Sequence, residues 1–259
     1  MSKIEVLGCS SGFCKDGGNT SCLCIDEQVL LDCGSGLEKL PLESLRKITT
    51  VILTHSHLDH ILFLPLLIDL NFEVYLKKPL QVYALPETIN AIKTHLLNNI
   101  IWPDFSTIPH SDEPVVKFYP LDFNQIIEID YHAFSLHPVN HSVPAAAIHV
   151  TNQQGKSLLF SGDTAANDSI WNLINKDPSI TTIIVECTFP NDQLELANIS
   201  KHYCPSVLAS EINTKLLAEL PVYITHTRVG QEALILQELC HSLTTKIAIK
   251  LSPYQTISW

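Results

Sequence analysis

"ILTHSHLDHILFL", residues 52–64, places four ionisable side chains between two apolar segments. These four are His55, His57, Asp59 and His60. Neutral imidazole and carboxylate are good ligands for zinc and similar divalent ions. Four such groups left buried without partners would be costly, because polar atoms lose their hydration in a protein interior. The stretch therefore predicts a metal site at the end of a strand. His55 and His57 are expected to converge on one ion, and Asp59 and His60 on a second.

Ligand-type residues also end other apolar, strand-like runs of the chain. The runs end at Asp32, His55, Asp163, Glu186 and His226. In α/β sheets, ligands collect where the strands end and the loops meet. We therefore expect these residues to line one site.

Two nearby metal ions need a bridging carboxylate and further imidazoles. Asp163 in "FSGDT" is the candidate bridge, and His226 in "YITHT" is a candidate imidazole. For the remaining imidazole, His137 competes with His141. We favour His141, because the loop-like "PVNHSVP" around it would free its side chain from strand pairing.

Apolar β-branched runs alternate with helix-like patterns along the chain. Strands are expected at residues 3–7, 28–32, 50–54, 81–84, 145–150, 157–161, 181–186, 221–225 and 246–251. Helices are expected at 58–70, 87–99, 204–219 and 230–243. Strands that are apolar almost throughout suggest sheets covered by other layers. The alternation therefore predicts one layered α/β domain.

Composition narrows the class of protein. Of 259 residues, 46% are hydrophobic and 17% are charged, so a sizeable core can form. No apolar run reaches the roughly 18 residues of a membrane span, and the N-terminus does not resemble a secretory signal. We expect a cytoplasmic protein without a membrane partner.

Eight cysteines without CxxC spacing are interpreted mainly as small buried residues. The net charge of −11 argues against a nucleic-acid partner.

The motif at residues 55–60 and the early "GNTSCLCIDEQVLLDCGSG" resemble the metallo-β-lactamase superfamily, as do Asp163 and His226. This resemblance implies an αββα four-layer sandwich with a dinuclear site at one edge. Residues 1–259 are expected to form this single domain, with an inserted helical or loop segment at about 71–120.

Further motifs resemble the class II cyclic-nucleotide phosphodiesterases. They are "THSHLDH", "THLLNNIIWPDFSTIP" (residues 94–109), "VECTFPNDQLELANISKHYCPSVLASEI" (185–212) and "ITHTR". The resemblance implies two divalent ions, zinc first, with manganese or iron as alternatives. The implied ligands of the first ion are His55, His57 and His141, and those of the second are Asp59, His60 and His226, with Asp163 between the ions.

Several other roles follow from the same resemblance, each beside a simpler interpretation. Asp32 orients a ligand imidazole, or it is a turn residue. Glu186 and His202 form a proton relay, or they are a buried capped glutamate and a helix-start histidine. Asp59 is expected to hold the proton of the attacking hydroxide.

Substrate contacts are open in the same way. Arg228 contacts a phosphate, or it is a surface arginine. Trp102 and Phe105 stack on a nucleobase, or they belong to the core.

The expected activity is hydrolysis of cAMP, cGMP or both to 5′-monophosphates. A tRNA 3′-processing endonuclease is a competing hypothesis, and such an enzyme would want a basic arm. The segment 71–120 has only four basic residues: Lys77, Lys78, Lys93 and Lys117. A hydrolase of another ester and a non-enzymatic nucleotide- or metal-binding module are two further hypotheses. A homodimer is possible.

Overall fold

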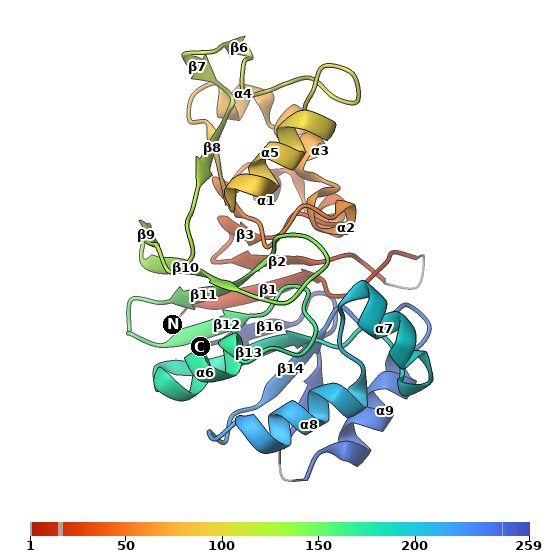
Figure 1. Cartoon of the computed structure of the whole chain (residues 1–259). Coiled ribbons are helices and arrows are strands. Elements are labelled where there is room, and N and C mark those ends of the chain that lie inside the picture. Colours follow the sequence, from red (N-terminus) through yellow and green to blue (C-terminus); the bar gives the residue numbers. More distant parts are fainter. Residues whose placement is uncertain (1, 15–17, 245) are drawn as a thin grey trace.

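The computed structural model describes residues 2–14, 18–244 and 246–259. Two seven-stranded sheets face each other in the middle of the molecule (Figure 1). The first has the order β16-β1-β2-β3-β4-β5-β8 and the second β15-β14-β13-β12-β11-β10-β9. Both sheets are mixed: in the second, β12 to β15 run parallel, and β9 to β12 pair antiparallel.

The strands of the first sheet are β1 (Lys3–Gly8), β2 (Cys22–Ile25), β3 (Val29–Leu31), β4 (Thr50–Ile52), β5 (Leu80–Ala84), β8 (Val116–Pro120) and β16 (Thr256–Ser258). Those of the second are β9 (Ile126–Ile129), β10 (His132–Pro138), β11 (Ala146–Thr151), β12 (Ser157–Phe160), β13 (Ile180–Glu186), β14 (Val222–Thr225) and β15 (Ala248–Lys250). A separate short hairpin joins β6 (Pro109–His110) and β7 (Glu113–Pro114).

Helices cover the outer face of each sheet (Figure 1). On the first sheet lie α1 (Leu42–Leu45), α2 (Leu58–Ile61), α3 (Leu64–Leu70), α4 (Phe72–Tyr75) and α5 (Pro86–His95). On the second lie α6 (Ser169–Lys176), α8 (Pro205–Lys215) and α9 (Glu232–Ser242), while α7 (Leu194–Ser200) lies at one end of the sandwich. The predicted αββα sandwich is therefore confirmed.

The alternation of side chains along a strand explains the layers. In β12, Leu158 and Phe160 pack between the sheets, whereas Leu159 packs outward against the helices. Because successive strand residues point to opposite faces, a strand covered on both sides must be apolar at nearly every position. This is why "SLLF" and "TIIVE" lack the polar alternation of a half-exposed strand.

The segment at about 71–120 is more than the helical and loop insertion that the sequence suggested. It contributes β5 and β8 to the first sheet, where β5 pairs with β4 and β8 in parallel. The residues between these strands contain α5, which packs on the first sheet, and the β6–β7 hairpin, which projects from the sandwich (Figure 1).

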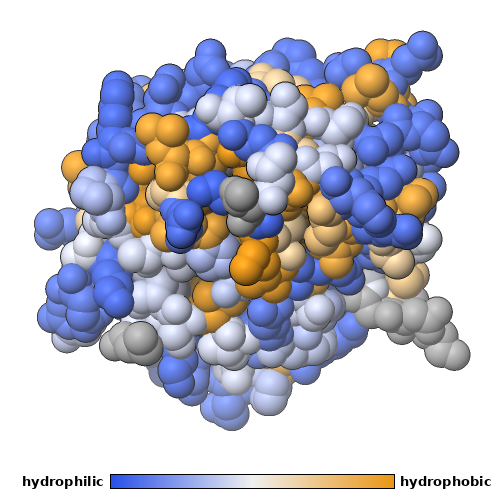
Figure 2. All heavy atoms as spheres, turned by 90° about the horizontal axis from the view of Figure 1, so that it is seen from below, coloured by the Kyte–Doolittle hydropathy of each residue, from blue (hydrophilic) through white to orange (hydrophobic). Residues whose placement is uncertain are grey.

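The face covered by α6, α8 and α9 carries mixed polar and apolar side chains when seen from below (Figure 2). Leu217 and Ile247, in the segments that follow α8 and precede β15, are largely exposed. Among the described residues, no helix has the length and apolar character that crossing a membrane requires.

Candidate dinuclear metal site

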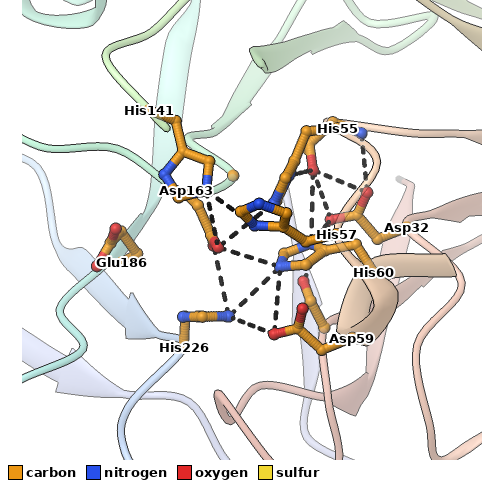
Figure 3. Close-up of polar contacts among 12 residues, drawn as sticks. Asp32, His55, His57, Asp59, His60, His141, Asp163, Glu186 and His226 are labelled. Atoms are coloured by element: carbon orange, nitrogen blue, oxygen red, sulfur yellow. Dashed lines mark hydrogen bonds and ion pairs between the residues drawn. The ribbon is translucent and has the colours of Figure 1, made fainter. Parts of the chain in front are cut away.

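The predicted ligands are supplied by loops that follow four strands. His55, His57, Asp59 and His60 come from the turn after β4 and from α2. His141, Asp163 and His226 follow β10, β12 and β14. Their side chains point toward one another in Figure 3. Strand ends thus converge at one edge of the sandwich, as the sequence pattern predicted.

Gly162 permits the close approach of two of these loops. Its φ is +57°, and a Cβ at this position would lie 2.9 Å from the Thr54 side chain. Any larger residue would separate the ends of β4 and β12. Gly162 therefore allows Asp163 to lie beside His55.

The first ligand group consists of His55, His57, His141 and Asp163, whose ligand atoms lie within 4.8 Å of one another. Nε2 of His141 is 3.1 Å from Nδ1 of His57. Nε2 of His55 is 3.6 Å from Oδ2 of Asp163. These four side chains can hold one metal ion.

The second group consists of Asp59, His60 and His226. Nε2 of His226 lies 3.3 Å from Nε2 of His60 and 3.2 Å from Oδ2 of Asp59. Asp163 reaches this group as well: its Oδ2 is 3.3 Å from Nε2 of His60. The carboxylate of Asp163 therefore lies between the two groups, in the position of a bridge.

The chemistry of these atoms fits metal ions. Nε2 of His55 and Oδ1 of Asp163 are buried and have no hydrogen-bond partner among the described residues. Buried polar atoms are nearly always paired, so these two require another partner. Imidazole nitrogens also face each other in both groups, where a shared cation is a better partner than a second ring nitrogen.

The pKa values of most of these side chains are shifted toward the protonation state that binds metal. Burial lowers the pKa of His55, His57 and His141, which keeps their imidazoles neutral. Burial alone would raise the pKa of Asp163, but the imidazoles of His226 and His60 hold it well below its usual range. Neutral imidazole and ionised carboxylate are the forms that bind metal.

A buried layer orients the ligands from behind. Oδ2 of Asp32 lies 2.7 Å from Nδ1 of His60, and Oδ1 accepts hydrogen bonds from the backbone N–H and hydroxyl of Thr54 at 2.8 and 2.9 Å. The Thr54 hydroxyl also lies 2.9 Å from Nδ1 of His55. Asp32 has a φ of 58°, so it is a turn residue whose carboxylate also contacts His60, and its orienting role stays a prediction. Sequence reasoning missed Thr54, although its position directly before the first ligand was a signal.

Glu186 and His202 form a close pair beside the ligands. Glu186 is fully buried, and its Oε1 lies 2.7 Å from Nδ1 of His202. Burial opposes protonation of His202, but the Glu186 carboxylate prevails and raises the pKa of His202 to about 9. The His202 ring stacks on that of His226 at 5.4 Å between centroids. The Glu186 carboxylate therefore favours the protonated form of the His202 imidazole, whose ring lies against the ligand cluster.

Thr188 joins this pair to a ligand. Its hydroxyl donates to Oε2 of Glu186 at 2.8 Å and lies 3.0 Å from Nδ1 of His226. Because the hydroxyl of Thr188 donates its own proton to Glu186, it can accept a hydrogen bond from the Nδ1–H of His226. Nε2 of His226 is then unprotonated and free for a metal ion. Sequence reasoning did not single out Thr188.

His137 belongs to neither ligand group. It lies within β10, opposite Ala147, and its ring contacts that of His149 at 5.8 Å between centroids. Because His137 is paired within the strand, its side chain lies on the face of the sheet that also carries Ala147 and His149. His141, in contrast, lies in the loop beyond the strand.

The two aromatic candidates for nucleobase stacking lie elsewhere. Phe105 is only 3% exposed and packs against Phe72 in the core above the first sheet. Trp102 packs against the same core. For Phe105 the expected nucleobase contact is wrong, because its buried ring has no free face for a base. Trp102 is likewise a core-packing residue in this structure.

Arg228 lies at the edge of the site. Its side chain is exposed, and its guanidinium carbon lies 5.2 Å from the centroid of Phe189. The Phe189 ring in turn contacts His202 at 5.7 Å between centroids. A cation–π contact of this kind holds a guanidinium in place while leaving its N–H donors available.

The family model described as "Anti-Pycsar protein Apyc1" matches residues 2–202, which is most of the chain. The chain belongs to this family. The resemblance to class II cyclic-nucleotide phosphodiesterases stays a prediction, whereas the metallo-β-lactamase fold is established.

Among curated relatives, transcription termination factor FttA of Methanosarcina mazei is 27% identical over 259 residues, covering 88% of this chain and 38% of that protein. 3′,5′-Cyclic-nucleotide phosphodiesterase 1 of Saccharomyces cerevisiae is 23% identical over 214 residues, covering 72% of this chain and 58% of that protein. The chain thus spans about 38% and 58% of the lengths of these two relatives.

Solved structures share the fold over the whole chain. Unliganded yeast PDE1 superposes with a TM-score of 0.80 at 17% identity, covering 99% of both chains. The short form of human tRNase Z superposes with a TM-score of 0.66 at 18% identity, covering 99% of this chain and 98% of that one. At these identities the likeness concerns the fold alone.

Proposed function

We propose that this chain is a metal-dependent phosphodiesterase that hydrolyses 3′,5′-cyclic nucleotides to 5′-monophosphates. The observation that carries the proposal is the Glu186–His202 pair beside two ligand groups that share Asp163. Two metal sites suit a phosphodiester, and a protonated imidazole suits a leaving alkoxide that must be protonated.

Two ions, zinc first, with manganese or iron as alternatives, would be held by the two ligand groups around Asp163. When bound, the ions supply charge neutralisation for the phosphate and a water molecule acidic enough to act as hydroxide. The protein's own residues perform the remaining tasks.

Two side chains would interact with the protons of the reaction, one at the attacking hydroxide and one at the leaving oxygen. Burial alone would raise the pKa of Asp59, but the hydrogen bond from His226 prevails and lowers this pKa to about 2. Because it stays ionised, Asp59 would accept a hydrogen bond from the attacking hydroxide and so hold the proton of that hydroxide in place. His202, oriented by Glu186, would donate a proton to the departing O3′ as its bond to phosphorus breaks.

Arg228 would contact the phosphate from the edge of the site. Its position on Phe189, next to His202, supports this role, since arginine binds phosphate through two parallel N–H donors. Substitution of Arg228 by Gln is expected to raise KM more than it lowers kcat, because the contact is present in both substrate and transition state.

A tRNA 3′-end endonuclease is the second candidate. Similarity to ribonuclease Z of Methanococcus maripaludis, 32% over 134 residues, favours it. The charge argues against it, because the net charge is −11 and the segment 71–120 has only four basic residues. Binding to RNA phosphates depends on a basic surface.

One experiment compares these activities directly. The protein is loaded with Zn²⁺ or Mn²⁺ and assayed on 3′,5′-cyclic purine and pyrimidine nucleotides, on 2′,3′-cyclic isomers, on bis(p-nitrophenyl) phosphate and on a precursor tRNA. Our proposal expects 5′-monophosphates from the 3′,5′-cyclic substrates. Cleavage of the generic diester alone would refute it, and release of a mature tRNA 3′ end with inert cyclic nucleotides would support the second candidate.

A further inference from the structure

Lys201 and His141 make two reciprocal contacts, although they lie 60 residues apart. The Nζ of Lys201 donates to the backbone oxygen of His141 at 3.0 Å. In return, Nδ1 of His141 lies 3.1 Å from the backbone oxygen of Lys201. The loop after β10 and the C-terminal end of α7 are therefore joined through both a side chain and a backbone carbonyl.

The backbone contact determines which ring nitrogen of His141 is free. A carbonyl oxygen only accepts hydrogen bonds, so Nδ1 must carry the proton. Nε2 is then unprotonated, and it is the atom that lies 3.1 Å from Nδ1 of His57 and faces the first ligand group. The Lys201 carbonyl therefore selects the tautomer of His141 that suits a metal ion.

Lys201 adopts an unusual backbone conformation to make this contact. It ends α7 with φ 58° and ψ 58°, in the left-handed region where glycine or asparagine is normally found. The Cβ of a lysine disfavours this conformation, so glycine or asparagine would be more stable at this helix end. The hydrogen bond from the Lys201 ammonium group to the backbone oxygen of His141 gives a physical reason for lysine at this position.

The same turn also positions His202, the next residue along the chain. The backbone N–H of His202 donates to the carbonyl of Ala197 at 2.9 Å, which keeps the turn tight against α7. The ring of His202 packs edge-on against that of His141 at 5.0 Å between centroids. A displacement of Lys201 would move both the metal-facing imidazole and the proposed proton donor.

We infer that Lys201 is a positioning residue: its ammonium fastens the His141 loop to the turn that carries His202. It holds Nε2 of His141 toward the first metal site and fixes its distance from the proton donor. The inference rests on the proposed function for the role of His202, but not for the orientation of His141.

Lys201→Asn is the decisive variant, because asparagine tolerates the left-handed conformation but lacks the ammonium group. Lys201→Arg retains a charged donor, and Lys176→Asn, at an exposed position in α6, is the matched control. The melting temperature of each metal-free protein shows whether it folds. Mn²⁺ titration, followed by the EPR signal of free Mn²⁺, gives the metal affinity without any substrate.

We expect Lys201→Asn to melt close to wild type without metal but to bind one of two Mn²⁺ ions roughly 10-fold more weakly. With a 3′,5′-cyclic nucleotide, kcat is expected to fall about 10-fold with little change in KM, because positioning affects the transition state. Lys201→Arg should recover most of both losses, and Lys176→Asn should match wild type.

Mn²⁺ affinities of Lys201→Asn within twofold of wild type would overturn the inference and leave Lys201 as a helix end only. Because that titration needs no turnover, its result stands even if no cyclic nucleotide is hydrolysed. If no cyclic nucleotide is hydrolysed, the proposed function fails, and the Mn²⁺ titration alone decides whether Lys201 positions His141.

Discussion

Asp32 accepts a hydrogen bond from Nδ1 of His60 at 2.7 Å, and neither side chain is exposed to solvent. Because an ionised carboxylate only accepts, the proton of His60 lies on Nδ1, and Nε2 is left facing Asp163 at 3.3 Å. Asp32, which directly follows β3, thus orients the ring of a candidate ligand 28 positions later.

Replacement of Asp32 by Asn should weaken metal binding. The amide would either turn its NH₂ group toward the Nδ1–H of His60 or lose the bonds from Thr54. We expect metal affinity or kcat/KM to fall about 10- to 100-fold, as for other residues that orient metal ligands. Metal titration and kinetics on the same preparation measure both. The exposed Asp192→Asn is the matched control, and equal losses in the two variants would argue against the orienting role.

Replacement of His202 by Ala should affect substrates according to their leaving groups. With a cyclic nucleotide the departing O3′ needs a proton, so kcat is expected to fall about 10²- to 10⁴-fold. With bis(p-nitrophenyl) phosphate the departing phenolate is stable, and kcat should change far less. The exposed His241→Ala serves as control. Full turnover of the cyclic nucleotide by His202→Ala would remove the proton relay.

Removal of metal should destabilise the protein. Chelation with EDTA leaves the imidazoles of both ligand groups facing one another without a shared cation. Addition of Zn²⁺ or Mn²⁺ at 100 times its Kd is expected to raise the free energy of unfolding by about 2.7 kcal/mol per site. Thermal melts with and without metal measure this change.

Asp163→Ala is the control for that experiment, because it removes the carboxylate shared by both groups. Its melting temperature should no longer respond to metal, and its activity should be lost. A metal response equal to that of wild type in this variant would show that the ions bind elsewhere.

His137 should make the metal-free protein sensitive to mild acid. Burial, and next the neighbouring His149, lower its pKa from 6.5 to about 4. The folded state therefore favours neutral His137. Its contribution to stability is fully present above about pH 6.5 and is lost as the pH falls toward about 4.

Chemical denaturation at pH 7 and pH 4.5 tests this prediction. His137→Gln should lose less unfolding free energy than wild type between these two pH values, and it should bind metal normally. An unchanged pH dependence would show that His137 titrates alike in the folded and unfolded states. Weakened metal binding would instead point to a link between His137 and the site.

Local sequence predicted several strands and helices well but missed others. β13 and β14 lie within one residue of the predicted ranges, because a strand buried on both faces is apolar throughout. The predicted helix 58–70 is divided into α2 and α3. Pro65 lacks the N–H that a continuous helix would bond to the carbonyl of Ile61. β10 was missed, since "HAFSLHP" mixes polar and apolar residues without a clear period.

The sequence by itself determined the layered α/β fold and the convergence of His55, Asp163 and His226, because ligand-type residues end apolar strands that must lie in sheets. Tertiary structure decided the rest. It separated His141 from His137 through the pairing of β10, and it buried Phe105 in the core. It also brought Lys201 onto His141. The Lys201–His141 contact joins segments 60 residues apart in the chain, and only the folded arrangement of the loop after β10 and the end of α7 brings them together.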